Sequence, residues 1–440
     1  MAVGYVSVAL AVLLQFSAWL PVSLQCSVSE NQTGQVIRLL NIMVQSENSS
    51  AANGFAPNPS ILLALRLASY HDNATERGML GRLQADAVNR VQKGLTFSSG
   101  TVALYCMAMQ ACCADPSLTP APGLKGGKKV LDMIKLLERK LKGEIENIDS
   151  KHVPLTNYYQ VGLDILALCM MGKPVTSHSV QRLIAASDNG GFSQGKSYSV
   201  DTASIAVLAL TCMRRSVKPH VSVILSLKIQ NALNRLIKNI LQETKSDGLI
   251  GNIYSTGLAM QALSVASTYN CSSTFQTVLE HVVSGSFENP MAASQVTPSL
   301  ENRNYLELNK LDCKEFKKIP AVLPLPPAPP TAQQGVLTIH YTVEDGIHNI
   351  FKDHIDVKVP AGSSLLRVME EAAKISPAKF SFTVVQSSWG PFVSSIQGLA
   401  GNTNDQTYWQ FLSGSTALDQ GVADYKPHDG EIIVAKFSKY

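Results

Sequence analysis

The sequence predicts a mainly α-helical protein in two unlike parts, an α/α toroid of the six-hairpin barrel type followed by a small β-rich α+β domain. Three observations predict this: a dense proline run at 319–330, repeated apolar segments before it, and alternating strand-like segments after it. The run holds six prolines, and each proline fixes φ and lacks an N–H, so no helix or central strand continues through it. We therefore expect a semi-rigid linker at 319–334 between a helical domain at 25–318 and a small domain at 335–440.

Residues 1–24 are typical of a secretory signal peptide. A short apolar stretch, broken by Gln15, ends at small residues near Ser23. No later segment offers about twenty uninterrupted apolar residues, so we expect no membrane insertion. Acceptor triplets for N-glycosylation begin at Asn31, Asn48, Asn73 and Asn270. These signals together predict a secreted, extracellular glycoprotein.

The cysteines and the net charge indicate a disulfide-bonded protein that does not bind nucleic acid. The chain has eight cysteines, and in an exported protein disulfides are the expected state. All of them precede the proline run, so the small domain must fold without a bridge. The formal net charge is only +4, with no basic run interleaved with aromatic residues. This composition excludes a nucleic-acid partner.

Five segments of the first part share an apolar, alanine- and leucine-rich pattern; they are 59–68, 99–108, 159–169, 200–212 and 254–263. The equivalent alanines of the last four, Ala108, Ala167, Ala209 and Ala262, are spaced by 59, 42 and 53 residues. Such spacings fit one pair of helices with loops per repeat.

The repeated segments are apolar on nearly every side, which indicates buried helices. Amphipathic stretches such as 130–140 and 229–241 lie between them. Buried and half-exposed helices that alternate favour a toroid with an inner and an outer ring; a superhelical solenoid is the alternative.

In a toroid the inner helices all run the same way, so their first residues should converge on one rim. These residues lie at 156–160, 201–202 and 252–255. A plainer interpretation is that Asp201 or Thr202, and Ser255 or Thr256, are simply helix N-caps. The two roles are compatible, and the sequence leaves both open.

The small domain is predicted from alternating strands at 335–343, 354–359, 380–385 and 431–437, with a capped helix at 363–374. Segments 387–395 and 407–414 are unusual, because they mix aromatic residues with amides, hydroxyls and glycine. If 407–414 is a strand, Tyr408 and Trp409 point to opposite faces, and one of them is free to meet a ligand.

Taken together, these segments resemble the secreted cobalamin carriers: intrinsic factor, transcobalamin and haptocorrin. The resemblance spans essentially the whole mature chain. It rests on a series of short segments in the same order on both sides of the proline run, at 57–62, 158–160, 166–169, 199–203, 208–213, 251–256, 289–291, 388–390, 408–414 and 423–425. The fold of that family, an α/α barrel plus a small β-rich domain with cobalamin between them, agrees with the prediction from the residues.

The resemblance implies a non-enzymatic, monomeric carrier that holds cobalamin (vitamin B12) as cargo, not as a catalytic cofactor, and delivers it to an endocytic cell-surface receptor. It also implies which positions face the ligand. These are Thr156, Tyr159, Gln160, Asp201, Asn252, Ser255, Gln295, Ser388, Trp389, Gly390, Pro391, Phe392, Val393, Trp409, Gln410, Phe411, Leu412, Ser413, Gly414, Ser415, Thr416, Ala417 and Leu418.

The family's disulfide pairing maps to Cys26–Cys271, Cys113–Cys313 and Cys169–Cys212, which leaves Cys106 and Cys112 as two expected buried thiols. The chain also departs from the transcobalamin branch. That branch has a histidine just before the Ser-Val-Asp-Thr motif that can ligate cobalt, whereas this chain has Tyr198. We therefore expect no protein ligand on the cobalt.

Two other functions fit parts of the sequence. Asp164 and Asp201 are candidate acid and base of an α/α-toroid glycoside hydrolase. A toroid that only binds other proteins is the second alternative. Among the nine histidines, His348 and His354 stand near one another without metal-ligand spacing, so the sequence predicts no metal bound by protein side chains.

Overall fold

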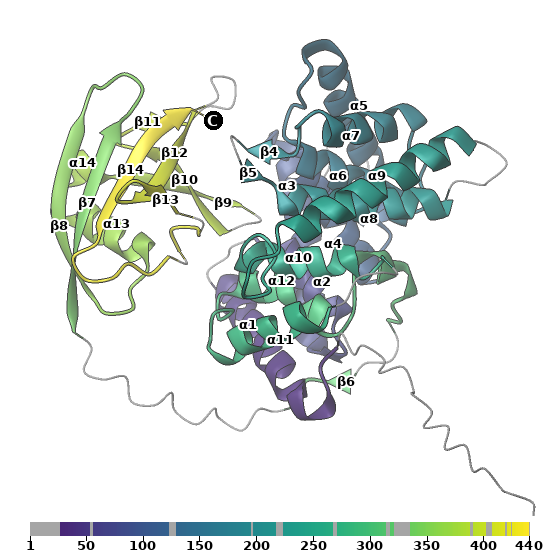
Figure 1. Ribbon diagram of the computed structural model, residues 1–440, viewed down its shortest axis with the longest axis horizontal. Coiled ribbons are helices and arrows are strands. Elements are labelled where there is room, and N and C mark those ends of the chain that lie inside the picture. Colours follow the sequence, from purple (N-terminus) through teal and green to yellow (C-terminus); the bar gives the residue numbers. More distant parts are fainter. Residues whose placement is uncertain are drawn as a thin grey trace, which may run out of the picture.

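We describe a computed structural model of the chain. It covers residues 27–52, 56–122, 129–194, 197–216, 223–266, 271–313, 317–320, 335–387, 390–401, 407–418, 420–423 and 425–439. The predicted signal peptide, most of the proline linker, Cys26, Asn270, Ser388 and Trp389 lie outside these residues. A helical unit and a strand-rich unit lie next to one another (Figure 1).

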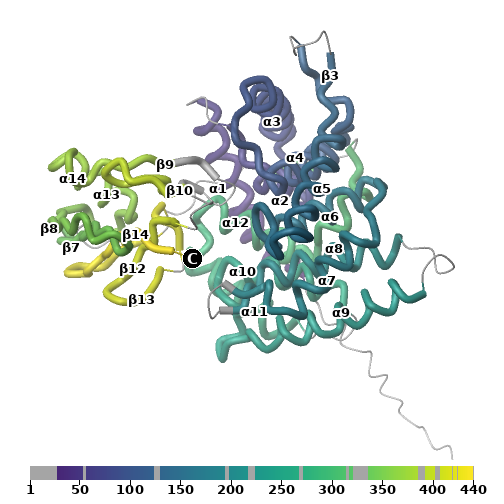
Figure 2. The backbone as a smooth tube through the Cα atoms, turned by 90° about the horizontal axis from the view of Figure 1, so that it is seen from above, coloured from purple at the N-terminus to yellow at the C-terminus, as the bar shows by residue number. Residues whose placement is uncertain are grey.

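Among the described residues, twelve α-helices build the helical unit. The inner ring consists of α2 (Pro59–Leu67), α4 (Ser99–Ala111), α6 (Tyr158–Met170), α8 (Val200–Ser216), α10 (Ile253–Leu263) and α12 (Pro290–Leu300). The outer ring consists of α1 (Thr33–Ala52), α3 (Asn73–Lys93), α5 (Met133–Lys151), α7 (Ser177–Asp188), α9 (Val223–Gln242) and α11 (Ser272–Val283). Figure 2 shows the helices wound around a common centre.

The ring is closed. Each inner helix contacts the next one, and α12 returns to contact α2. The Val28 N–H donates to the carbonyl of Leu300 at 2.8 Å, so the start of the unit is tied to the end of its last inner helix. The parallel pair β1 (Tyr70–His71) and β6 (Lys317–Lys318) adds a second tie. The predicted toroid is thus confirmed, and the solenoid alternative is wrong.

Short elements complete the helical unit. They are the 3₁₀ turns η1 (Glu30–Gln32), η2 (Pro116–Leu118) and η3 (Tyr305–Lys310), and the strand pairs β2 (Thr119–Pro120) with β3 (Val130–Leu131) and β4 (Ser193–Gln194) with β5 (Ser197–Tyr198). Tyr305, at the start of η3, is almost fully buried beneath the ring. The ring therefore encloses a packed core, not a channel.

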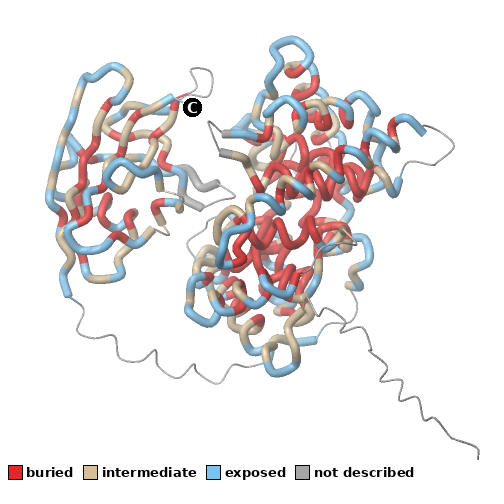
Figure 3. The backbone as a smooth tube through the Cα atoms, in the orientation of Figure 1, coloured by how far each residue is buried: buried red, intermediate tan, exposed pale blue. Residues whose placement is uncertain are grey.

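Burial follows the sequence pattern. Every residue of α2 is buried, as are nearly all residues of α4 and α10. In the outer helix α5 only one stripe is buried, which includes Leu137, Leu141 and Ile148. Figure 3 shows this contrast between a buried centre and an exposed outer surface. In the part of the chain that the structure describes, none of the helices has the length and apolarity to cross a bilayer.

Two disulfides between described residues join distant parts of the helical unit. Cys113 pairs with Cys313 and Cys169 with Cys212, as the resemblance implied. Cys271 is disulfide-bonded, and its expected partner Cys26 lies outside the described residues. Cys106 and Cys112 are free thiols, but only Cys106 is fully buried. The prediction of two buried thiols is wrong for Cys112, because that residue caps the end of α4, where the helix reaches the edge of the core.

In its described residues, the small unit contains a mixed five-stranded sheet, an antiparallel three-stranded sheet and two helices. The larger sheet has the order β13 (Thr416–Ala417), β12 (Thr407–Ser413), β14 (Ile432–Lys439), β7 (Val336–Asp345) and β8 (Lys352–Pro360). The smaller one has the order β11 (Leu399–Ala400), β10 (Gly390–Ile396) and β9 (Phe382–Ser387). Helix α13 (Leu365–Ile375) packs on β8 and β7, and the short α14 (Pro377–Phe380) follows it.

The small unit has its own hydrophobic core, separate from that of the ring. Its largest buried side chains include Tyr341, Phe437 and Trp409, at 1%, 2% and 3% exposed. The Trp409 and Phe437 rings lie 5.3 Å apart between centroids. This aromatic packing stabilises the unit, which has no cysteine.

Glycine allows two of the inner helices to approach closely. A Cβ added at Gly257 of α10 would lie 2.7 Å from the carbonyl carbon of Gln295 and 2.9 Å from the Cα of Val296, both on α12. These are backbone atoms, so no rotamer change relieves the contact.

We expect Gly257→Ala to lower the free energy of unfolding by about 1–3 kcal/mol, because α10 and α12 must separate. Gly81→Ala on the exposed side of α3 is the matched control: no atom lies within 4 Å of its added Cβ. This control should be neutral or stabilising by up to about 1 kcal/mol, because alanine has the higher helix propensity. Denaturant unfolding measures both, and equal stability of the two variants would contradict the close approach.

Candidate functional site

The six inner helices begin on one rim of the ring, and each begins with a side-chain cap. The caps are Asn58, Ser98, Asn157, Ser199, Asn252 and Asn289, and each accepts a hydrogen bond from a backbone N–H in the first turn. The interpretation of Asp201, Thr202, Ser255 or Thr256 as N-caps is therefore wrong. The chain begins α8 and α10 one to three residues earlier, so Asp201 and Ser255 lie inside the first turn with their side chains free of capping.

Asp201 and Ser255 join two neighbouring helices at this rim. The Ser255 hydroxyl donates to Asp201 Oδ2 at 2.9 Å. Burial raises the pKa of the Asp201 carboxyl above its ordinary value, and the hydrogen bond from Ser255 opposes this rise. The arrangement places a partly buried carboxylate where a ligand on the rim can donate to it.

The start of α6 contributes a second polar group. The Gly100 N–H of α4 donates to Gln160 Oε1 at 3.0 Å, so the glutamine is held between two helices. Burial raises the pKa of the Tyr159 phenol well above its ordinary value, so it remains a neutral donor. Asn252, another predicted position, uses its Oδ1 to cap α10 at 2.9 Å from the N–H groups of Tyr254 and Ser255.

A buried glutamate holds the loop before α6, and sequence reasoning missed it. Glu144 of α5 is 2% exposed and accepts from the Thr156 hydroxyl at 2.8 Å and the Thr156 N–H at 3.1 Å. The same carboxylate accepts from the Ser99 hydroxyl at 3.0 Å. The detectable signal was a glutamate on the apolar stripe of α5, three residues after Leu141. It positions Thr156 and therefore the predicted rim.

Two polar residues lie deeper than the rim. Gln295, a predicted ligand position, lies in the middle of α12 and is 4% exposed. Asp164, in the middle of α6, is fully buried, and burial raises its pKa well above the ordinary value. A carboxyl in this position cannot reach a sugar substrate, so the pairing of Asp164 with Asp201 in a hydrolase is not supported.

In the small unit, Trp409 faces the interior. Its indole N–H donates to the carbonyl of Leu399 at 2.9 Å, and its ring contacts Phe351 and Phe437. The Trp409 ring therefore belongs to the core, because residues alternate along β12 and the core requires its large rings on the inner side. A direct contact of Trp409 with the ligand stays a prediction. Tyr408 and Gln410 lie on the opposite, half-exposed side.

The same alternation divides the predicted residues of β10. Val393 is 4% exposed and belongs to the core, whereas Phe392 is 50% exposed. The contact of Val393 with the ligand stays a prediction, whereas the ring of Phe392 is accessible from the surface. Ser388 and Trp389 lie outside the described residues, and of Gly390 and Pro391 only the backbone is described.

The remaining predicted positions form the end of β12 and its hairpin with β13. Ser413 donates to Glu431 at 2.6 Å, and Phe411 and Leu418 pack on the core. Gly414 adopts a positive φ of 58° that makes the turn. Leu412 is half-buried, and Ser415, Thr416 and Ala417 are exposed. The hairpin tip is therefore the accessible part of this segment.

The two units present these segments toward one another. In Figures 1 and 2, β9 and β10 lie on the side of the small unit that is turned toward the helical unit. Figure 1 also shows the β4–β5 hairpin, which leads into α8, on the facing side. The capped rim and the Phe392 strand thus lie on neighbouring surfaces.

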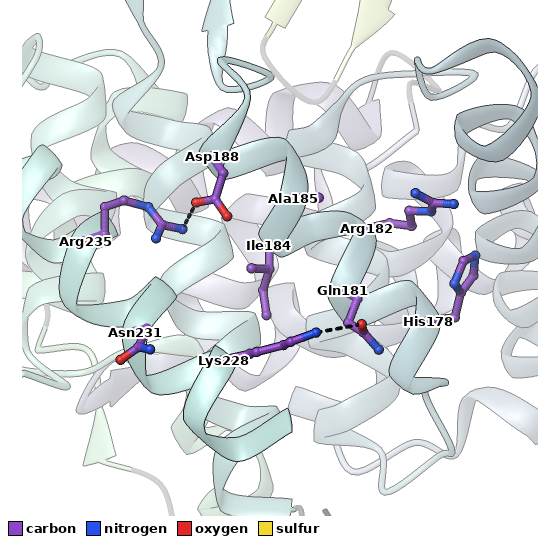
Figure 4. Close-up of a pocket in the computed structure, with 9 residues that line it drawn as sticks. All are labelled: His178, Gln181, Arg182, Ile184, Ala185, Asp188, Lys228, Asn231 and Arg235. Atoms are coloured by element: carbon purple, nitrogen blue, oxygen red, sulfur yellow. Dashed lines mark hydrogen bonds and ion pairs between the residues drawn. The ribbon is translucent and has the colours of Figure 1, made fainter. Parts of the chain in front are cut away.

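A separate groove lies on the outside of the ring, between α7 and α9. It has a volume of about 570 Å³ and is lined by long polar chains (Figure 4). Lys228 contacts Gln181 Oε1 at 3.3 Å, and Arg235 pairs with Asp188. Asp188 is the one carboxylate in this lining, whereas Arg182, Lys228 and Arg235 are basic, so the groove is net positive.

Comparison with known proteins gives a consistent result. Residues 7–334 match a family model described as eukaryotic cobalamin-binding protein, and residues 362–439 match one described as a domain of unknown function. The chain is 36% identical over 435 residues to transcobalamin-1 of Homo sapiens, with 94% of each chain covered. It is 34% identical over 423 residues to the cobalamin binding intrinsic factor of Mus musculus, again over 94% of each.

A solved structure shows the same architecture. Haptocorrin in complex with Cbi matches with a TM-score of 0.77 at 33% identity, over 94% of this chain and 99% of that one. The match therefore includes both the helical ring and the small unit. With a closed six-hairpin ring, a capped polar rim and relatives aligned over nearly the whole length, this chain belongs to the eukaryotic cobalamin-binding protein family.

Proposed function

We propose that this protein binds one cobalamin as cargo between its two units and transports it without chemical change. The observation that carries the proposal is the Asp201–Ser255 pair at the rim of the ring, in a chain of the cobalamin-binding family. A corrin ring carries amide side chains, which need both acceptors and donors. Asp201 supplies an acceptor, Tyr159 a donor, and Gln160 an amide group.

The small unit supplies the apolar part of the proposed site. The exposed ring of Phe392 and the half-exposed ring of Tyr408 suit the flat edges of a corrin. Trp409 acts indirectly in this proposal, because it holds β12 against the core. Closure of two surfaces around one ligand desolvates both of its sides, and pre-formed surfaces reduce the ordering penalty of binding.

The cellular role follows the same proposal. We infer a secreted, monomeric glycoprotein that an endocytic cell-surface receptor takes up with its cargo. Asn31, Asn48 and Asn73 support it, because all three are exposed in the structure and accessible to a glycan. The proposal also includes a glycan on Asn270 and a secretory signal peptide at residues 1–24.

The first prediction is tight binding without turnover. Equilibrium dialysis of the full secreted chain with cyanocobalamin should give one ligand per chain, and the ligand should be recovered unaltered. Affinity weaker than micromolar would contradict the proposal.

Because the proposed ligand contacts lie on both units, separate fragments provide a second test. Fragments 26–318 and 335–440 each contain a complete hydrophobic core, so each should fold alone, bind weakly, and reassemble when cobalamin is added. Full affinity in the helical fragment alone would show that the small unit is not part of the site.

The second prediction concerns Asp201 and pH. Its pKa is raised above the ordinary 3.8 by burial, so the carboxylate becomes a neutral acid early as the pH falls. Ligand N–H donors favour the ionised form, so affinity should decrease as the pH falls through this raised pKa. Asp201→Asn should weaken binding at neutral pH by roughly 10- to 100-fold, the value of a hydrogen bond to a charged group, and should flatten the pH profile.

Asp115→Asn is the matched control. Asp115 caps η2 after the far end of α4, and asparagine caps equally well. Competition against labelled cyanocobalamin between pH 4 and 8 measures all three proteins. An unchanged profile in Asp201→Asn would remove this carboxyl from the site.

The third prediction concerns the cobalt. Tyr198 packs against the ring core, and burial raises its pKa, so its phenol stays protonated and is a poor metal ligand. His178 lies on the outer surface beside Asp149, 2.9 Å away, and His220 is outside the described residues. Bound aquocobalamin should therefore exchange its water for added cyanide or azide.

Absorption spectra after ligand addition measure this exchange. Tyr198→His should slow it, because a neutral imidazole ligates transition metals readily. Tyr198→Phe is the control and should exchange like the natural protein. Blocked exchange in the natural protein, with an imidazole-like spectrum, would show that a histidine reaches the cobalt.

A further inference from the structure

Two histidines and an aspartate lie together on the outer face of the five-stranded sheet. In the antiparallel register of β7 and β8, His340 is opposite Asp356 and Thr342 is opposite His354. Because alternate residues of a strand share a face, all four side chains lie on the same side. The sequence analysis found no metal-ligand spacing here, because only the strand pairing brings residues 16 positions apart into contact.

The three side chains converge on one point. His340 Nδ1 lies 2.7 Å from Asp356 Oδ1, and His354 Nε2 lies 3.1 Å from the same oxygen. One ligand atom from each residue lies within 4.8 Å of the other two. The two imidazole rings are nearly parallel, 17° apart. Small rotations of these exposed side chains would place all three atoms around one ion.

A fourth residue orients the cluster. The Thr342 hydroxyl lies 3.2 Å from His354 Nδ1, so the other ring nitrogen, Nε2, is turned toward Asp356. Histidine ligands are commonly held in this way by a hydrogen bond to their second nitrogen.

We propose that His340, His354 and Asp356 bind a divalent first-row transition ion, with Zn²⁺ as the representative. Two imidazoles and a carboxylate suit zinc and copper, whereas calcium and magnesium prefer all-oxygen sites. Three protein ligands leave a fourth position for water or for a donor from a partner molecule.

The site is independent of the proposed cobalamin site. β8 is an edge strand of its sheet, and Figures 1 and 2 show β7 and β8 on the side of the small unit away from the ring. The side chains of His354 and Asp356 are 54% and 57% exposed. An ion therefore has direct access from solvent, and cargo binding should not depend on it.

Isothermal titration of the full, tag-free, cobalamin-free chain with Zn²⁺ tests the proposal. We expect one site, and no comparable heat with Mg²⁺. His340→Ala, His354→Ala and Asp356→Asn should each weaken binding at least about tenfold, and Thr342→Val should weaken it by a similar factor through loss of the orienting hydrogen bond. With Cu²⁺, electron paramagnetic resonance should show coupling to two imidazole nitrogens, reduced to one in either histidine variant.

His428→Ala is the matched control. His428 is an exposed histidine beside a single carboxylate, that of Glu431, and its removal should leave Zn²⁺ affinity unchanged. Cyanocobalamin binding and far-ultraviolet circular dichroism verify the folding of each variant. Absence of a Zn²⁺ site in the natural chain, or equal affinity in the folded His340→Ala and Asp356→Asn variants, would overturn the proposal and leave a hydrogen-bonded surface cluster only.

Discussion

Closure of the inner ring is the constraint on which the rest of the structure depends. Six apolar helices can bury all of their faces only if the last one returns to the first, and here α12 contacts α2. The close approach at Gly257 and the bond from Val28 to Leu300 are parts of that closure. Once the ring is closed, every inner helix runs the same way. Six helix starts, each with polar backbone N–H groups, must then share one rim.

Side-chain caps accept hydrogen bonds from these N–H groups, so other polar side chains of the first turns are available for further contacts. Asn and Ser side chains at the cap positions satisfy the first-turn N–H groups. Asp201 and Ser255, inside the first turn, bond across helices α8 and α10. The carboxylate is partly desolvated but keeps a partner, which raises its pKa without leaving it isolated. Helix capping and the bond between helices are therefore made by different residues of the same turns.

The small unit is stabilised by aromatic packing instead of disulfides. It has no disulfide, so its sheet is held by aromatic packing around Trp409, Phe437 and Tyr341. That demand places Trp409 inside and leaves Phe392 and Tyr408 for other contacts. The opposite face of the sheet is polar, and there cross-strand pairing assembles His340, His354 and Asp356. The alternation of side chains along the strands thus decides which residues enter the core and which lie on the outer face of the sheet.

By itself, the sequence determined the helical repeats and the strands of the small unit, because apolar periodicity acts locally along the chain. It also indicated Asp201 and Ser255 as rim residues. The tertiary structure alone decided which of two adjacent side chains faces inward, as with Tyr408 and Trp409, since that depends on the neighbours of the strand. It also decided the buried support of Thr156 by Glu144 and the pairing of His340 with Asp356. Each of these contacts joins separate elements, and no local pattern in the sequence specifies the register or packing that brings them together.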